Sequence, residues 1–183
     1  MWTAIFHPED APATPYTEWT FGGPVTRMPE FAAPKLGRVN NLVSMEVEVP
    51  ENASGVLYAL GAFSGGLSCY VKDGVLCYEY NLFEIERTQI KAKEKLAAGK
   101  VKIEVESKSA EAKPASPLEV ILRVNGKEVA KGRVPITAPL AFTANDCLDI
   151  GSDLGSPVSL DYFDKAPFQF NGKIIDTKMK HLK

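Results

Sequence analysis

The chain has 183 residues, of which 45% are hydrophobic and 24% are charged, and its formal net charge is −2. This length and composition are typical of one globular domain with a substantial core. The near-zero charge excludes electrostatic attraction to nucleic acid or an anionic membrane, and no apolar run approaches the roughly 20 residues that span a bilayer. Residues 1–8 lack the basic and apolar regions of a signal peptide, so we expect either a cytoplasmic chain or part of a longer secreted precursor.

The first 34 residues are rich in proline and in aromatic side chains. Six of the 13 prolines fall here, namely Pro8, Pro12, Pro15, Pro24, Pro29 and Pro34. Proline removes a backbone donor and resists helix formation, so this stretch is expected to be extended. We therefore divide the chain into an arm or linker over residues 1–34 and a folded domain over residues 35–183. The aromatic residues indicate that the arm lies along a hydrophobic surface, either of its own domain or of a partner.

From Asn41 onward the hydrophobic pattern has the period of two that is typical of β-strands. Residues 43–49 alternate between apolar and polar side chains, which predicts a half-buried strand. Residues 55–63 are almost continuously apolar, as in a strand that is covered on both faces.

Two dipeptides, Asp73-Gly74 and Asn125-Gly126, have the composition of type I′ hairpin turns. The first turn should join strands over residues 67–72 and 75–81. Their predicted inner face consists of Leu67, Cys69, Val71, Leu76, Tyr78 and Tyr80. This register places Cys69 and Cys77 on opposite faces of the sheet, so no disulfide is expected between them.

The rest of the chain continues this pattern. Further strands are expected over residues 101–106, 118–124, 127–134 and 168–179 and at Asp149-Ile150, with a mobile loop over residues 108–117. A single helical turn is expected over residues 91–98, where Gly99 would end it. Many short strands separated by turn signals predict an all-β, antiparallel β-sandwich with an extended proline-rich N-terminal arm.

Oxygen-bearing side chains and glycines gather between residues 145 and 164. Calcium binds six to eight oxygen ligands from such flexible loops. The candidate ligands are Asp146, Asp149, Asp153 and Asp161. The alternative interpretation is structural, because aspartates also cap turns through hydrogen bonds to backbone donors.

Catalytic residues are scarce in this sequence. The two histidines, His7 and His181, lie near the termini, so a nucleophile–histidine arrangement within the fold is not expected. Glu84 and Glu86 would project from one strand face and could act as the paired carboxylates of a glycan-cleaving enzyme. The alternative is a solvated strand edge with Arg87 as the counter-ion.

Aromatic side chains on the outer face of a sandwich can stack on sugar rings. Tyr70 is a candidate because it lies on the sheet face opposite the predicted core, and Phe63 and Tyr162 are candidates because they lie in loops. The alternative interpretation places these aromatic residues in the core.

Several segments together resemble the C-terminal region of bacterial arylsulfatases, over about residues 26 to 180. They are residues 56–66 (VLYALGAFSGG), 70–74 (YVKDG), 78–81 (YEYN), 124–130 (VNGKEVA), 148–159 (LDIGSDLGSPVS) and 170–174 (FNGKI). The resemblance implies a jelly roll of the concanavalin-A or laminin-G type, a class in which many members bind sugars. It also implies a bacterial source.

The resemblance does not extend to sulfatase chemistry. Arylsulfatases form formylglycine within a Cys/Ser-x-Pro/Ala-x-Arg motif, and none of the three cysteines stands in such a motif. The chain alone should therefore not hydrolyse sulfate esters. The resemblance implies an accessory domain that contacts a sulfatase catalytic domain or self-associates, supporting folding, oligomerisation or substrate access. A module that binds sulfated or other glycans and a glycan-cleaving enzyme are the alternatives.

Overall fold

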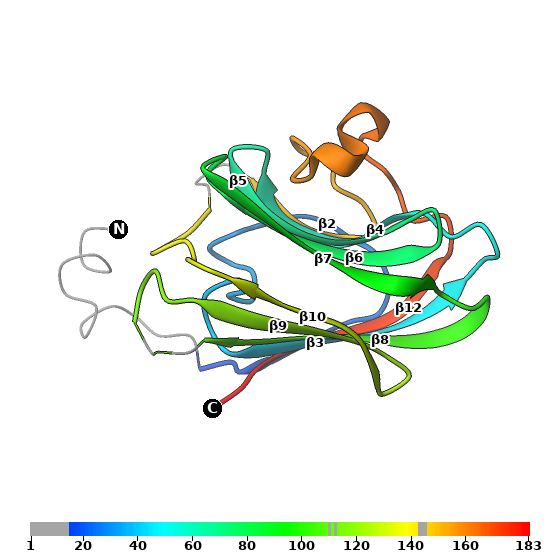
Figure 1. Cartoon of the computed structure of the whole chain (residues 1–183), viewed down its shortest axis with the longest axis horizontal. Helices are drawn as coiled ribbons and strands as arrows, with labels where there is room; N and C mark the ends of the chain where they lie inside the picture. Colours follow the sequence, from blue (N-terminus) through cyan, green and yellow to red (C-terminus); the bar gives the residue numbers. More distant parts are fainter. Residues whose placement is uncertain (1–14, 110, 112, 143–145) are drawn as a thin grey trace.

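The computed structural model describes residues 15–109, 111, 113–142 and 146–183, which form two six-stranded antiparallel sheets packed face to face (Figure 1). The first sheet has the order β1 (Glu18–Phe21), β12 (Lys173–His181), β3 (Asn41–Val49), β8 (Gly99–Ser109), β9 (Leu118–Val124) and β10 (Lys127–Val134). The second has the order β2 (Val25–Pro29), β11 (Cys147–Ile150), β4 (Gly55–Ala62), β5 (Gly65–Lys72), β6 (Val75–Leu82) and β7 (Glu86–Lys95). The predicted all-β sandwich is confirmed. None of the described residues forms a helix long and apolar enough to cross a membrane.

Both predicted hairpin turns are present. Asp73 and Gly74 have φ angles of 52° and 85°, and Asn125 and Gly126 have φ angles of 51° and 80°. Positive φ at both central residues is the requirement of the type I′ turn, whose twist matches that of the flanking strands. The β5–β6 register that follows pairs Cys69 with Tyr78 and Tyr70 with Cys77, and the cysteines are free, as expected.

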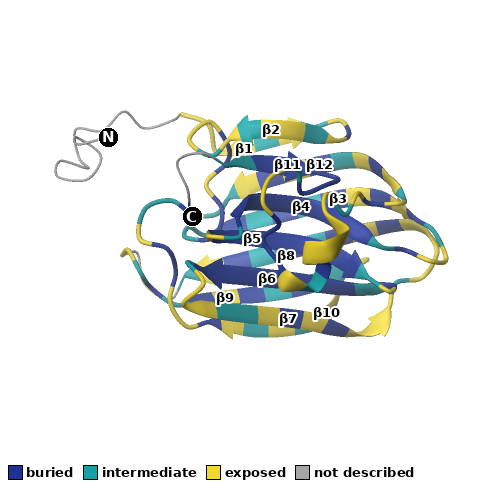
Figure 2. Cartoon of the chain, turned by 90° about the horizontal axis from the view of Figure 1, so that it is seen from above, coloured by how far each residue is buried: buried dark blue, intermediate teal, exposed yellow. Residues whose placement is uncertain are grey.

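The main core lies between the two sheets. It includes every member of the predicted inner face of the β5–β6 hairpin, together with the apolar positions of β3, β8 and β9. Strand β4 is buried at every position, which confirms the expectation of a strand covered on both faces. Figure 2 shows buried residues along the central strands and exposed residues along the outermost ones.

The described part of the proline-rich arm lies along its own domain. Strand β1 pairs with β12 in the first sheet, and β2 pairs with β11 in the second. Both are outermost strands, where prolines are tolerated because the unpaired edge needs no backbone donor. His7 and the aromatic residues at positions 2 and 6 lie outside the described residues.

The helical turn predicted over residues 91–98 is wrong. Residues 91–95 belong to β7, where Lys91 pairs with Cys77 and Lys95 pairs with Val75. Alanine and lysine favour helices in isolation, but pairing with β6 and burial of Ile90 and Ala92 outweigh that preference.

The outer face of the second sheet is covered by the chain itself. Residues 151–168, here called the covering segment, contain the 3-10 helix η1 (Leu160–Lys165) and lie over β4, β5 and β6 (Figure 1). A second, smaller apolar cluster forms beneath the segment. Its members are Val56, Ala59, Tyr70, Cys77, Val158 and Tyr162. This cluster explains why β4 has no exposed face.

Candidate functional site

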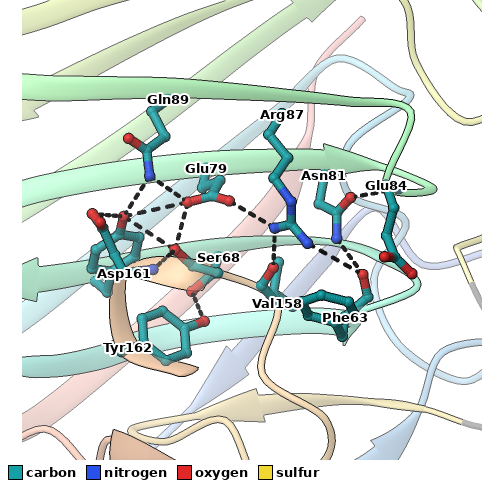
Figure 3. Close-up of polar contacts among 12 residues, drawn as sticks. Phe63, Ser68, Glu79, Asn81, Glu84, Arg87, Gln89, Val158, Asp161 and Tyr162 are labelled. Carbon is teal, nitrogen blue, oxygen red and sulfur yellow. Dashed lines mark hydrogen bonds and ion pairs between the residues drawn. The ribbon is translucent and has the colours of Figure 1, made fainter. Parts of the chain in front are cut away.

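A buried carboxylate lies at the centre of the interface between the second sheet and the covering segment (Figure 3). Glu79 of β6 is 1% exposed. Its oxygens accept hydrogen bonds from Arg87 Nη1 at 2.9 Å, Gln89 Nε2 at 2.7 Å and Ser159 Oγ at 2.5 Å. Alternation along the strands brings these groups together, because Glu79 pairs with Gln89 across β6 and β7. Burying a charge is costly unless it is paired and hydrogen-bonded, and Glu79 meets both conditions.

Asp161, the second residue of η1, attaches the helix to the sheet. Its carboxylate accepts hydrogen bonds from Tyr70 Oη at 2.8 Å and from Lys72 Nζ and Lys91 Nζ, each at 3.0 Å. Burial raises the pKa of Asp161, but the hydrogen bonds from Tyr70, Lys72 and Lys91 outweigh burial and lower its pKa to about 2. Asp161 therefore stays ionised near neutral pH and holds η1 against β5 and β7.

The aspartates proposed as calcium ligands are engaged by donors of the protein. Asp149 accepts hydrogen bonds from the backbone of Arg27 and Leu154, and Asp153 accepts them from the backbone of Val158 and from Tyr162 Oη.

Asp146 accepts hydrogen bonds from the backbone of Cys147 and Ser156, and Asp161 is held as described above. Within the described residues, no group of three or more His, Cys, Asp or Glu side chains is placed to hold a metal ion. The contacts correspond to the structural alternative, in which these aspartates cap turns.

Tyr70 and Tyr162, proposed as sugar-stacking residues, are not exposed. Tyr70 lies on the outer face of β5, as its position predicts, but the covering segment leaves it 0% exposed. Tyr162 is 1% exposed, packs edge-on against Tyr70 at 5.1 Å between ring centroids and donates to Asp153. Neither ring offers a face to a ligand in this arrangement, because side chains of the protein occupy both.

Two phenylalanine rings do reach the surface beside the buried network. Phe63, in the β4–β5 turn, is half-buried, and Phe163 of η1 is 47% exposed. The rings meet edge to face at 5.3 Å between centroids, and the Arg87 guanidinium lies 5.0 Å from the Phe63 centroid. We call Phe63, Phe163, Arg87 and Glu84 the rim platform. The adjacent aromatic pair at positions 162 and 163 was the only sequence signal for Phe163.

Glu84 and Glu86 do not form the predicted catalytic pair. Glu84 lies in the β6–β7 turn with φ of 61°, so it does not share a strand face with Glu86 at the start of β7. Asn81 holds this turn, since its Oδ1 accepts from Glu84 N at 2.9 Å and its Nδ2 donates to Phe63 O at 2.6 Å. The Glu84 side chain is exposed and points toward the Phe63 side of the turn (Figure 3).

Arg87 also differs from its expected role. It is not the solvated counter-ion of a strand edge, because it pairs with buried Glu79 and donates to the carbonyl of Val158 at 2.7 Å. Sequence reasoning missed Ser159 and Gln89 as partners of Glu79. The Ser159 contact depends on how the covering segment folds back, and the Gln89 contact depends on the pairing of β7 with β6.

No protein-family model and no curated protein matches this chain. Solved structures do match it. The CBM40 of the Ruminococcus gnavus IT-sialidase, bound to α2,3-sialyllactose, is 13% identical with a TM-score of 0.61, covering 90% of this chain and 93% of that one. Domains LG4–5 of the mouse laminin α1 chain are 14% identical with a TM-score of 0.55, covering 92% of this chain and 43% of that one. The galectin LEC-6 of Caenorhabditis elegans is 11% identical with a TM-score of 0.50, covering 88% and 96%.

At these identities the likeness establishes the fold, which is a jelly-roll β-sandwich of the CBM40 and laminin-G type. The fold implied by the sequence resemblance is thus confirmed. The structural neighbours give no support to an arylsulfatase origin.

Proposed function

We propose that this domain is a carbohydrate-binding module and that it binds glycans at the rim platform. The observation that carries the proposal is the Phe163 ring, 47% exposed and held edge-on against Phe63 beside a guanidinium and a carboxylate. A contiguous apolar surface bordered by polar groups is a feature of binding sites, and here the adjacent rings of Phe63 and Phe163 form it together.

The rim platform has the two kinds of group that sugar recognition requires. The exposed face of Phe163 can pack against the C–H face of a pyranose ring. Glu84 can accept hydrogen bonds from sugar hydroxyls, and Arg87, which is 19% exposed, can donate to them. The Arg87 side chain is held in place by Glu79, and the backbone of Glu84 is held by Asn81. Little ordering entropy would then be lost on binding.

The structural neighbours support the same class of ligand. The R. gnavus CBM40 is described in complexes with α2,3- and α2,6-sialyllactose, and another neighbour is a galectin. In this chain the covering segment occupies the outer face of β4–β6. A glycan would therefore bind beside that face, at the rim, rather than across it.

The accessory role that the arylsulfatase resemblance implies is the other candidate, and its structural support is an exposed aromatic residue at the edge of the sandwich. Phe31, just after β2, is 63% exposed and would be part of a docking surface. Gel filtration of the chain, alone and mixed with a sulfatase catalytic domain, tests this role. Co-elution or a dimer would support docking.

A glycan screen tests the main proposal. The array should include neutral, sialylated, uronate-containing and sulfated glycans, each with calcium and again with chelator. We expect selective binding to a subset of glycans that does not change in chelator, because the described residues offer no metal cluster. A blank array would contradict the proposal and direct attention to a protein partner.

A further inference from the structure

A cavity lies at the edge of the sandwich where the chain crosses from the first sheet to the second. It has a volume of about 650 Å³, within the range of about 300–1,000 Å³ that small-molecule sites occupy. Its lining includes the β1–β2 turn at Gly22 and the segment between η1 and β12, with Gln169 and Phe170. The cavity has no residue in common with the rim platform.

Ser152 provides an unused polar group in this cavity. Ser152 lines the cavity and is only 8% exposed, yet its hydroxyl makes no hydrogen bond to any described residue. Ser68 and Ser159 on the same sheet face, by contrast, both use their hydroxyls within the protein. Among the described residues, the buried side-chain oxygens without a partner are Ser116 Oγ and Thr177 Oγ1, so the Ser152 hydroxyl is reached by solvent and can bond to a ligand that enters the cavity.

Lys173 provides the charge. It is exposed at the start of β12, lines the cavity and forms no ion pair with any described residue, although Glu48 is its neighbour in the β12–β3 ladder. No acidic side chain lines the cavity, so its lining carries a single positive charge. Two more polar residues that line the cavity, Thr26 and Gln169, are exposed, and their side chains make no hydrogen bond to any described residue.

The base of the cavity is apolar, because Ile150, Phe170 and Ile174 are buried there. The ligand should therefore combine one negative charge, several hydroxyls and an apolar face. We infer that this cavity binds a small hydroxylated carboxylate of sugar size, with Lys173 facing the carboxylate and Ser152 and Thr26 facing hydroxyls. A hexuronate such as glucuronate has this chemistry.

The test is a titration of the ¹⁵N-labelled chain with glucuronate, glucose and acetate, followed by NMR. Glucuronate should shift the backbone signals of Gly22, Thr26, Ser152 and Lys173. It should bind at least fivefold more tightly than glucose, which lacks the charge, or acetate, which lacks the hydroxyls. Equal binding of all three, or no shifts at these residues, would overturn the inference.

Two variants locate the site. Gly22→Phe should abolish binding by filling the cavity, and it should fold, because a Cβ at Gly22 meets no atom within 4 Å and its φ is not left-handed. Lys173→Met should weaken glucuronate binding at least fivefold and leave glucose unchanged. Lys178→Met on the same strand is the matched control and should change nothing. Unchanged binding in Gly22→Phe would refute the site, whereas Phe163→Ala should leave it intact and so distinguishes this cavity from the rim platform.

Discussion

Arg87 and Glu79 form an ion pair of 2.9 Å in which the Glu79 side chain is 1% exposed and the Arg87 side chain is 19% exposed. The same guanidinium nitrogen donates to the carbonyl of Val158, so one residue of β7 connects β6 to the covering segment. Pairs of this kind add little net stability when intact, but they are expensive to break because the remaining charge stays buried. The pair therefore makes the position of the covering segment specific.

Glu79→Gln should destabilise the fold by about 3–5 kcal/mol, since it leaves Arg87 without its counter-ion. Urea denaturation followed by circular dichroism measures this change. The matched control is Glu104→Gln, which breaks a surface pair with Lys102 and should cost less than about 1 kcal/mol. The double variant Glu79→Leu, Arg87→Met should recover part of the loss. Equal costs for the two single variants would show that the buried pair has no special role.

Stability should decrease as pH rises between about 4 and 6 because of Asp153. Burial raises the pKa of Asp153 from 3.8 to about 6, and this effect outweighs the hydrogen bonds from Val158 and Tyr162, which lower the pKa. The folded state then binds this proton more tightly than the unfolded chain does. The stabilisation of the folded state by this proton is complete below the pKa of the unfolded chain and is lost as pH rises through about 6. The loss in the free energy of unfolding is up to about 3 kcal/mol.

Asp153→Asn should remove this slope, because asparagine cannot ionise but keeps an acceptor for Val158 and Tyr162. Urea denaturation at several pH values between 4 and 7 checks the prediction. Asp164→Asn, an exposed position of the same segment, is the control. A slope that persists in Asp153→Asn would assign the pH dependence to another group.

Gly55→Ala should displace the chain that directly follows the covering segment and so loosen the segment itself. A Cβ at this position would overlap the backbone of Gln169 and Phe170, and Gly55 also has φ of 123°. Gly99 has a similar φ of 109° but open space around it, so Gly99→Ala reports backbone strain alone, roughly 1–2 kcal/mol. We expect Gly55→Ala to lower the free energy of unfolding by about 1–3 kcal/mol more than Gly99→Ala does. It should also speed hydrogen exchange in residues 151–168. Equal losses of stability in Gly55→Ala and Gly99→Ala would mean that the backbone of Gln169 and Phe170 moves aside easily.

The three cysteines should remain free thiols and differ in reactivity. Cys69 is fully buried, burial raises the pKa of Cys77 to about 11, and Cys147 is half-buried. Because thiolate is the reactive form, the native protein should react with a thiol reagent first at Cys147, and all three should react in denaturant. Fewer than three thiols in denaturant without reductant would contradict this prediction.

The architecture was predictable because its signals are local. A two-residue turn such as Asp73-Gly74 determines the pairing of the strands on either side, and the period of two then assigns each side chain to a face. Tyr70 shows the limit of this reasoning. Its face was correctly assigned, but its burial depends on a segment about 90 positions later, since Asp161 is its hydrogen-bond partner.

The covering segment itself could not be predicted because it has no hydrophobic period. Its glycines, prolines and aspartates indicate loops, and the same aspartates suit calcium or turn capping equally well. The distinction lies in which donors reach these aspartates. One donor to Asp149 is the backbone N–H of Arg27, which is 122 positions away and comes close only in the folded chain. The helical propensity of residues 91–98 failed for a related reason, since pairing with β6 is a tertiary interaction.

Phe163→Ala tests the central claim, glycan binding at the rim platform, most directly. Calorimetry with the strongest ligand from the glycan screen should show an affinity about 5- to 150-fold lower in Phe163→Ala, which corresponds to the loss of about 1–3 kcal/mol of binding free energy. Phe31→Ala, which removes another exposed phenylalanine on the segment after β2, should bind as the wild type does. Unchanged affinity in Phe163→Ala, or equal losses in both variants, would contradict the rim platform as the glycan site.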